Sequence, residues 1–574
     1  MSNFSQNSAK QHMEQYFFRV AAADFKKIPG NPIAYWLSPR VGNAFEVHKP
    51  ISQFFPVNPG IRTGKDEWFL RLWHEVSVNK TQFGLTSAKE MAPDKKWFPL
   101  HKGGSFRKWY GNAEHVIDLL GNADNIRKNS PDFRLREEKW YFRPFISWSR
   151  ISSSDIAFRY FPHGVLFSDA GPGVFADESC LHSMALLNSK LGNLFLTIIN
   201  PTLNYQKQDV EAVPYATTSS NPNISDAVLF EKNDWDSFET SWDFQQSPLL
   251  LPCYERLTLE KTYGVLVAHW LKVTHELQLI EEENNRIFIE AYGLQDGLTP
   301  DVPLNEITLT CNRHYRYRSD KTEAELEALL LADTMREFVS YAVGCMFGRY
   351  SLDKPGLVLA NQGETLADYL VQVPNPIFTP GQDNVIPMLD GDWFTDDITE
   401  RFRQFLRITF GEEHYDENLT FIEDAIGKDI RKFFLRDFYS DHVKRYKKRP
   451  IYWLFSSPKG TFNALVYLHR YRPDTASVVL GYLRDFRNKL DAHLKHLEQV
   501  SISTNASQAE KSRALKEIDN LKKQLLELDD YEHDTLYPLA TQQIAINLDD
   551  GVKVNYLKFG SALKKIVGLD NKED

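Results

Sequence analysis

Two leucine-rich stretches near the end of the chain constrain its fold most strongly. In residues 476–500 and 510–532 apolar side chains recur every three or four positions, and the polar segment SISTNASQ lies between them. This spacing places the apolar side chains on one face of each helix, which predicts an antiparallel helical hairpin with coiled-coil packing. The expected contact residues are Leu483, Phe486, Leu490, Leu494 and Leu497, and then Leu515, Ile518, Leu521, Leu525 and Leu528.

The rest of the chain divides into a mixed part and a mainly helical part. Residues 1–220 alternate short strands, Pro- and Gly-rich turns and helices, one of them predicted over 112–128, so an α+β domain is expected. Residues 221–255 are predicted to form a linker or long loop. Residues 256–475 form a mainly helical domain, and residues 476–574 form the hairpin and a C-terminal tail. Several domains are expected, because single cores stop growing near ~250–300 residues.

The cysteines and the hydropathy favour a soluble protein of the cytoplasm. The four cysteines lie far apart without a CxxC pair, so neither a zinc site nor a disulfide framework is predicted. The first residues are polar, unlike a signal peptide, and no apolar run approaches the ~20 residues that cross a bilayer. No membrane partner is expected.

The charge is distributed unevenly along the chain. The formal net charge is -10, yet residues 1–215 carry 26 Lys and Arg against 20 Asp and Glu, a balance of +6. The remainder carries 41 against 57, a balance of -16. Because phosphate binding depends on local potential and not on the whole-chain sum, the N-terminal part is the better place to look for a polyanion partner.

The motifs of common catalytic sites are missing from the sequence. FSDAGPGVF, residues 167–175, resembles the Gly-rich turn of a nucleotide- or S-adenosylmethionine-binding sheet, but no helix start follows it directly, so a plain β-turn is favoured. There is no GxxxxGK[ST], HExxH or GxSxG motif, and no NPP followed by an aromatic residue. No catalytic residue and no metal ligand is predicted.

The run KKWFPLHKGGSFRKWYGN, residues 95–112, is the first candidate for DNA binding. Its glycines would let the backbone approach a phosphate closely, its cations would neutralise phosphates, and its aromatic residues could stack. The alternative is a Gly-turned hairpin whose aromatic residues enter the core and whose cations are merely solvated. The candidate residues are Lys95, Lys96, Lys102, Gly103, Gly104, Arg107, Lys108 and Trp109.

A second basic run, KRYKKR, is followed by the apolar stretch IYWLF. Pro450 ends the helix that carries the cations, and IYWLF then reads as a buried strand. The aromatic residues Tyr452, Trp453 and Phe455 are therefore expected in the core, with a base-stacking platform as the alternative. The cations are candidates for a phosphate-facing ridge: Lys444, Arg445, Lys447, Lys448 and Arg449.

Six motifs occur in a fixed order along the chain: FKKIPGNPIAYWLS, FRKWYGNAEHVIDL, LNSKLGNLFLTIINPTLNYQKQDVEAVPY, FVSYAVGCMFGRYSLDKPGL, KRPIYWLFSSPKGTFNALVYLHRYRPDT and LDDGVKVNYLKF. Together they resemble the C-terminal half of the PglX family, the adenine-specific DNA methyltransferases of BREX phage-defence systems. The resemblance spans residues 16–565. It implies that residues 1–220 are a target-recognition domain for double-stranded DNA, with Asn204, Tyr205 and Lys207 as further candidate DNA contacts.

The resemblance also implies what this chain lacks. The family's other half binds S-adenosylmethionine and carries the NPP-aromatic motif that holds a flipped adenine. This chain has neither, so it is expected to be inactive alone, to bind no cofactor itself, and to work with a catalytic methyltransferase half or with other BREX proteins. The alternative function is a protein–protein scaffold of the BREX assembly that does not read DNA directly.

Overall fold

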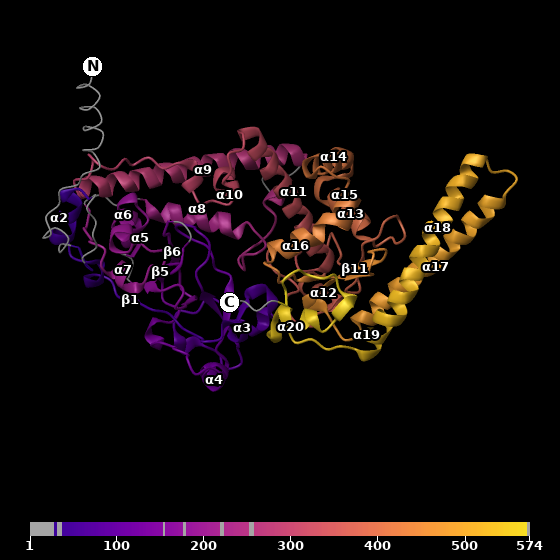
Figure 1. Ribbon diagram of the computed structural model, residues 1–574, viewed down its shortest axis with the longest axis horizontal. Coiled ribbons are helices and arrows are strands. Elements are labelled where there is room, and N and C mark those ends of the chain that lie inside the picture. The colour runs from indigo at the N-terminus through magenta and orange to yellow at the C-terminus, as the bar shows by residue number, and fades with distance from the viewer. Residues whose placement is uncertain are drawn as a thin grey trace, which may run out of the picture.

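The computed structural model describes residues 28–30, 37–152, 155–175, 180–218, 223–251 and 258–570. It confirms a mixed α+β protein, with three small sheets and a large helical part (Figure 1). Within these ranges, every helix is too short or too polar to span a bilayer.

The N-terminal region contains two four-stranded sheets. One has the strand order β1-β8-β5-β6 and is antiparallel, whereas the other has the order β2-β4-β3-β7 and only its β3–β7 pair is parallel. The strands are β1 (Val57–Asn58), β2 (Leu70–Leu72), β3 (Trp97–His101), β4 (His115–Asp118), β5 (Phe145–Trp148), β6 (Phe158–Phe161), β7 (Leu166–Phe167) and β8 (Gly173–Val174). The helices are α2 (Pro39–Val47), α3 (Asp66–Phe69), α4 (Leu120–Asn129), α5 (Cys180–Leu187), α6 (Lys190–Ile199), α7 (Lys207–Glu211) and α8 (Ile224–Asp236).

Two segments of this region differ from the sequence-based prediction. The expected helix over 112–128 begins instead as the central strand β4, because Val116 and Ile117 are buried and a short apolar run does not distinguish a strand from a buried helix. In the segment expected to be a linker or long loop, residues 224–236 form helix α8. This helix is anchored by its buried residues Ile224 and Ala227.

Helix α9 (Leu259–Ala291) joins the N-terminal region to the helical region. Its 33 residues correspond to about 50 Å. Leu259 and Leu266 pack into the helical core, whereas Leu277 and Phe288 pack into the N-terminal core, and Trp270 contacts both. Figure 1 shows α9 running along one side of both regions.

The helical region surrounds a three-stranded antiparallel sheet of order β10-β11-β9. Every residue of β10 is buried, since Tyr452 and Leu454 face one core while Trp453 and Phe455 face another. This confirms the core position of the IYWLF aromatic residues. The elements are α10 (Arg313–Tyr317), α11 (Glu323–Phe347), α12 (Leu366–Gln372), β9 (Ile386–Pro387), α13 (Ile398–Phe410), α14 (Tyr415–Ile426), α15 (Ile430–Phe433), a π-helix (Phe434–Phe438), α16 (Tyr439–Arg445), β10 (Tyr452–Ser456) and β11 (Asn463–Tyr467).

Helices α17 (Thr475–Ile502) and α18 (Gln508–Tyr531) pack together as the predicted hairpin, which projects from the body of the molecule (Figure 1). Ion pairs show the antiparallel register, because Arg484 of α17 lies 2.7 Å from Glu532, the residue directly after α18, and Glu498 of α17 lies 3.0 Å from Lys522 of α18. The tail continues through α19 (Tyr537–Gln542) and α20 (Gly551–Leu557).

The predicted contact residues of the hairpin are buried with one clear exception. Leu515 is 58% exposed, and its neighbour Ala514 occupies the contact in its place. Leu525 is partly buried at the edge of the same core. The predicted spacing is therefore correct, but at Leu515 the predicted contact position is shifted by one residue from the observed one.

Candidate nucleic-acid interface

The first predicted DNA-contact run contains an arginine that lies inside the molecule. Arg107 is 3% exposed, and its Nη2 lies 2.9 Å from Glu231 Oε2 and 2.6 Å from Asp234 Oδ2, both on α8. Asp234 also accepts the backbone N–H groups of Thr310 and Cys311. Burial raises the pKa of Glu231 to about 8, against the opposing effect of the guanidinium. We call Arg107, Glu231 and Asp234 the buried ion-pair cluster.

Lys108 and Trp109 also point inward. The Lys108 ammonium pairs with Glu281 of α9, and the Trp109 indole donates a hydrogen bond to the same carboxylate at 2.7 Å. Burial raises the pKa of Glu281, while Lys108 lowers it. In this conformation Arg107, Lys108 and Trp109 fix the N-terminal sheets to α8 and α9, so the structure gives no support to their predicted contact with phosphate.

Lys95 and Lys96 lie at the surface but have partners in the protein. Lys95 Nζ donates to the carbonyl of Asn79 at 2.5 Å. Lys96 Nζ lies 3.3 Å from Asp549 and 3.8 Å from Asp118. Because Asp549 belongs to the C-terminal segment, Lys96 helps to fasten that segment to the N-terminal sheet.

Lys102 is partly exposed, and the two glycines after it shape a turn. Its Nζ lies 3.0 Å from Asp66. Gly103 and Gly104 have φ of 95° and 151°, and a Cβ on Gly104 would meet the Asn112 side chain at 2.5 Å. The glycines are therefore required by packing within the protein itself, which is the role the hairpin alternative assigned to them.

The weaker candidates in the loop after α6 are divided between surface and interior. Asn204 is exposed, whereas Tyr205 is buried and its carbonyl accepts the indole N–H of Trp148 at 2.9 Å. Lys207 Nζ lies 3.0 Å from Glu211 one turn along α7. Among these three, Asn204 is the side chain best placed to meet a ligand.

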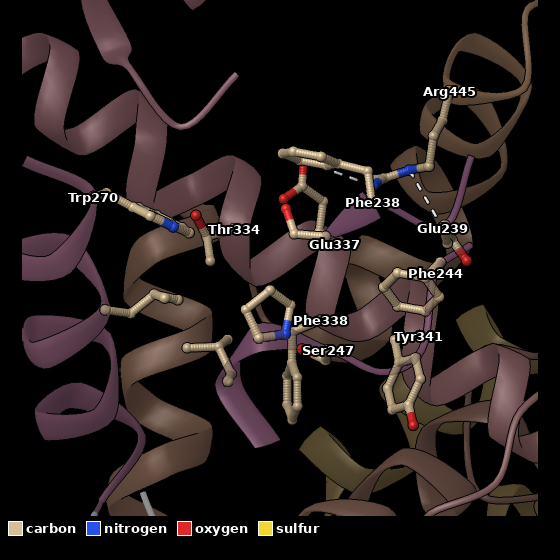
Figure 2. A pocket seen from close by; sticks show the side chains of 14 residues that line it. Phe238, Glu239, Phe244, Ser247, Trp270, Thr334, Glu337, Phe338, Tyr341 and Arg445 are labelled. Atoms are coloured by element: carbon tan, nitrogen blue, oxygen red, sulfur yellow. Dashed lines mark ion pairs between the residues drawn. The ribbon is translucent and has the colours of Figure 1, made fainter. Parts of the chain in front are cut away.

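The cations of the second basic run also differ in their surroundings. Arg445 lies 2.8 Å from Asp441 and 3.8 Å from both Glu239 and Glu337. Figure 2 shows Arg445 reaching these last two carboxylates at one end of a small cavity of about 30 Å³ lined mainly by aromatic and apolar side chains. Lys444, by contrast, is exposed and has no ion-pair partner among the described residues.

Lys447, Lys448 and Arg449 form a tight turn after α16. Lys447 and Lys448 have φ of 50° and 60°, a left-handed conformation that is unusual for residues other than glycine. Lys447 Nζ lies 2.5 Å from Glu114, and Arg449 Nε lies 3.9 Å from Glu75. The turn therefore joins the helical region to the N-terminal region, while the Lys448 side chain is left exposed.

The structure brings the two basic runs together at one groove, which we call the seam groove. Lys102, Lys447 and Arg449 line this cavity of about 410 Å³ between the two regions. Acidic residues line the seam groove in nearly the same number as cations. The acidic residues are Asp66, Glu67, Glu75 and Asp550, and the cations are Arg71, Lys102, Lys447, Arg449 and Lys553. Trp68 at its edge is 55% exposed, with Lys65 Nζ 4.5 Å from the ring centroid.

Sequence reasoning missed a second group of cations. Arg436, Lys459, Lys564 and Lys565 are exposed and line one cavity together with Lys448. They come from separate segments, so the sequence does not show that they lie together. Local signals are the SPKG turn and the Lys-Lys pair at 564–565.

The Gly-rich turn at 167–175 does not fit S-adenosylmethionine. A Cβ on Gly171 would lie 2.5 Å from the His101 ring, and a Cβ on Gly173 would lie 2.8 Å from Phe175. These glycines are therefore packed against the protein's own side chains, as expected for a structural β-turn.

The chain is similar to two adenine-specific methyltransferases. It is 36% identical over 571 residues to adenine-specific methyltransferase BrxX of Escherichia coli O9:H4 (strain HS), an alignment that covers 95% of this chain and 46% of that protein. It is also 36% identical over 585 residues to adenine-specific methyltransferase PglX of Lacticaseibacillus casei (strain Zhang), which covers 96% of this chain and 46% of that protein. No protein-family model matches. The chain thus spans about half the length of these relatives.

Proposed function

We propose that this chain is the DNA-recognition part of a BREX-type adenine-N6 DNA methyltransferase and works with a catalytic part that binds S-adenosylmethionine. The observation that carries the proposal is the 36% identity to BrxX and PglX over nearly the whole chain. The positive balance of residues 1–215 and the exposed cations Lys444 and Lys448 support it.

The test is binding of the full chain to double-stranded DNA, measured by fluorescence anisotropy at several salt concentrations. Phosphate-dominated binding predicts that log K falls linearly with log salt, with a slope of roughly -0.9 for each phosphate neutralised. Absence of binding at about 50 mM salt contradicts the proposal. Adding the catalytic part of a relative and measuring adenine-N6 methylation then tests whether the chain supplies the specificity.

A scaffold function is the second candidate, and the hairpin favours it. Leu515 and Leu526 are 58% and 64% exposed, and their separation of 11 residues places them on one face of α18. Such a face fits another protein of the defence system. Co-elution of the full chain with those proteins, lost in a Leu515→Glu/Leu526→Glu variant, would support this function.

A further inference from the structure

A wide groove lies where the hairpin meets the body of the molecule, and we call it the hairpin groove. It is a cavity of about 740 Å³. One wall is formed by α17 and α18, and the other by the π-helix, the turn between β10 and β11, and residues 564–567. The floor includes the apolar residues Phe486, Leu490 and Leu521, which belong to the hairpin core.

The charge of the hairpin groove is opposite to that of the whole chain. Two carboxylates line it, Asp390 and Glu517, and Glu517 already accepts a contact from His493 at 2.8 Å. Five cations line it, although the chain has 67 Lys and Arg against 77 Asp and Glu. The five are Arg436, Lys448, Lys459, Lys564 and Lys565.

These five cations differ from those of the seam groove in being unpaired. All five are exposed, and within the described part of the chain none has an ion-pair partner. In the seam groove, by contrast, Lys102, Lys447 and Arg449 each face a carboxylate. Unpaired like charges around one cavity repel one another, so the arrangement favours an anionic ligand that neutralises them.

The backbone at two of these cations is uncommon in proteins. Arg436 lies in a π-helix, a form that appears mostly as single turns and often at functional sites. Lys448 follows Lys447 in a left-handed conformation, which persists where the surroundings enforce it. The ion pair between Lys447 and Glu114 fixes this turn to the N-terminal region.

The residue types suit a phosphate ligand. Four of the five cations are lysines, which bind phosphate as point charges. Asn520 and Gln524, one turn apart on α18, add amide donors of the kind that contact phosphate oxygens. The groove also begins beside the turn that joins the helical region to the N-terminal region.

We infer that the hairpin groove binds the sugar-phosphate backbone of double-stranded DNA, on a surface separate from the predicted recognition domain. This inference rests on the proposed function. It gives the hairpin a role in holding the duplex, so that affinity independent of sequence comes from the C-terminal part of the chain.

The test is a Lys459→Gln/Lys564→Gln/Lys565→Gln variant of the full chain, with duplex DNA as the probe. The control is Lys495→Gln/Lys516→Gln/Lys523→Gln, which makes the same charge change on exposed positions of the hairpin outside the groove. If each groove lysine neutralises one phosphate, the slope of log K against log salt becomes shallower by up to about 2.7, and affinity near 100 mM salt falls at least ~10-fold. The control should retain the wild-type slope.

The outcomes separate this inference from the proposed function. If the wild type binds DNA and the groove variant binds equally well, the inference is overturned and the proposed function stands. An equal loss in the control overturns the inference as well, because total charge then explains the effect. Unchanged DNA binding with lost binding of a poly-glutamate peptide overturns it in favour of an acidic protein ligand. If the wild type does not bind DNA at low salt, the proposed function itself fails.

Discussion

Replacing Arg107 by methionine separates a structural role from a DNA-binding role for the same residue. The substitution keeps much of the side-chain volume but leaves Glu231 and Asp234 buried without their cation. Breaking a buried ion pair from one side costs about 3–5 kcal/mol. Glu231 can relieve part of this cost by taking up a proton, since burial already raises its pKa to about 8.

The assay is thermal unfolding followed by circular dichroism, with DNA binding measured on the same samples below the transition. The entropy of unfolding is about 2.1 cal/mol/K per residue, so over 574 residues 1 kcal/mol shifts Tm by about 0.8 °C and the expected loss corresponds to roughly 2.5–4 °C in Tm. The matched control is Lys102→Met from the same basic run, which should change stability by less than ~1 kcal/mol because its pair with Asp66 is partly exposed. An Arg107→Met variant with wild-type Tm and lost DNA binding would refute the reasoning.

Four further substitutions test other parts of the structure by unfolding experiments. Burial lowers the pKa of His469 to about 3 in the folded chain, whereas the unfolded chain protonates this residue near pH 6.5. The free energy of unfolding should therefore fall by about 1.4 kcal/mol for each unit by which the pH is lowered between these two values. The variant His469→Gln should lose this pH dependence. Leu521→Ala should cost about 2–5 kcal/mol and Leu515→Ala about 0.5 kcal/mol or less, because only Leu521 lies in the hairpin core. Asp549→Asn should cost about 1–3 kcal/mol, since asparagine can still accept the Trp97 indole N–H but loses the ion pairs with Lys80 at 3.0 Å and Lys96 at 3.3 Å. A wild-type unfolding midpoint for Leu521→Ala or Asp549→Asn, or an unchanged pH dependence for His469→Gln, would contradict the corresponding expectation.

The hairpin shows which part of the fold could be predicted from the sequence. Apolar spacing of three and four located α17 and α18, because helix periodicity is a local property. The same reasoning failed at β4, where Val116 and Ile117 are buried in a central strand and carry no periodic signal. The sequence did not predict helix α8 because its segment is largely polar. The helix is stabilised by contacts of Ile224 and Ala227 with the N-terminal core, which a local pattern does not show.

The candidate site was harder to predict because charge alone does not tell whether a cation is buried. Arg107 and Lys108 have the same local sequence character as Lys102, yet their acidic partners lie more than a hundred residues away on α8 and α9. The groove lysines are equally nonlocal, since Lys459 and Lys564 meet only in the folded chain. Pairing across such distances is a property of the tertiary structure.

Helix α9 has a consequence for how the molecule unfolds and how it can be divided. The apolar side chains of its first half pack into the helical core, and those of its second half pack into the N-terminal core. A fragment starting at residue 256 would therefore expose Leu277, Phe288 and Ile289, an apolar surface that promotes aggregation. The two regions should exchange amide hydrogens with similar protection along α9, as parts of a single cooperative unit.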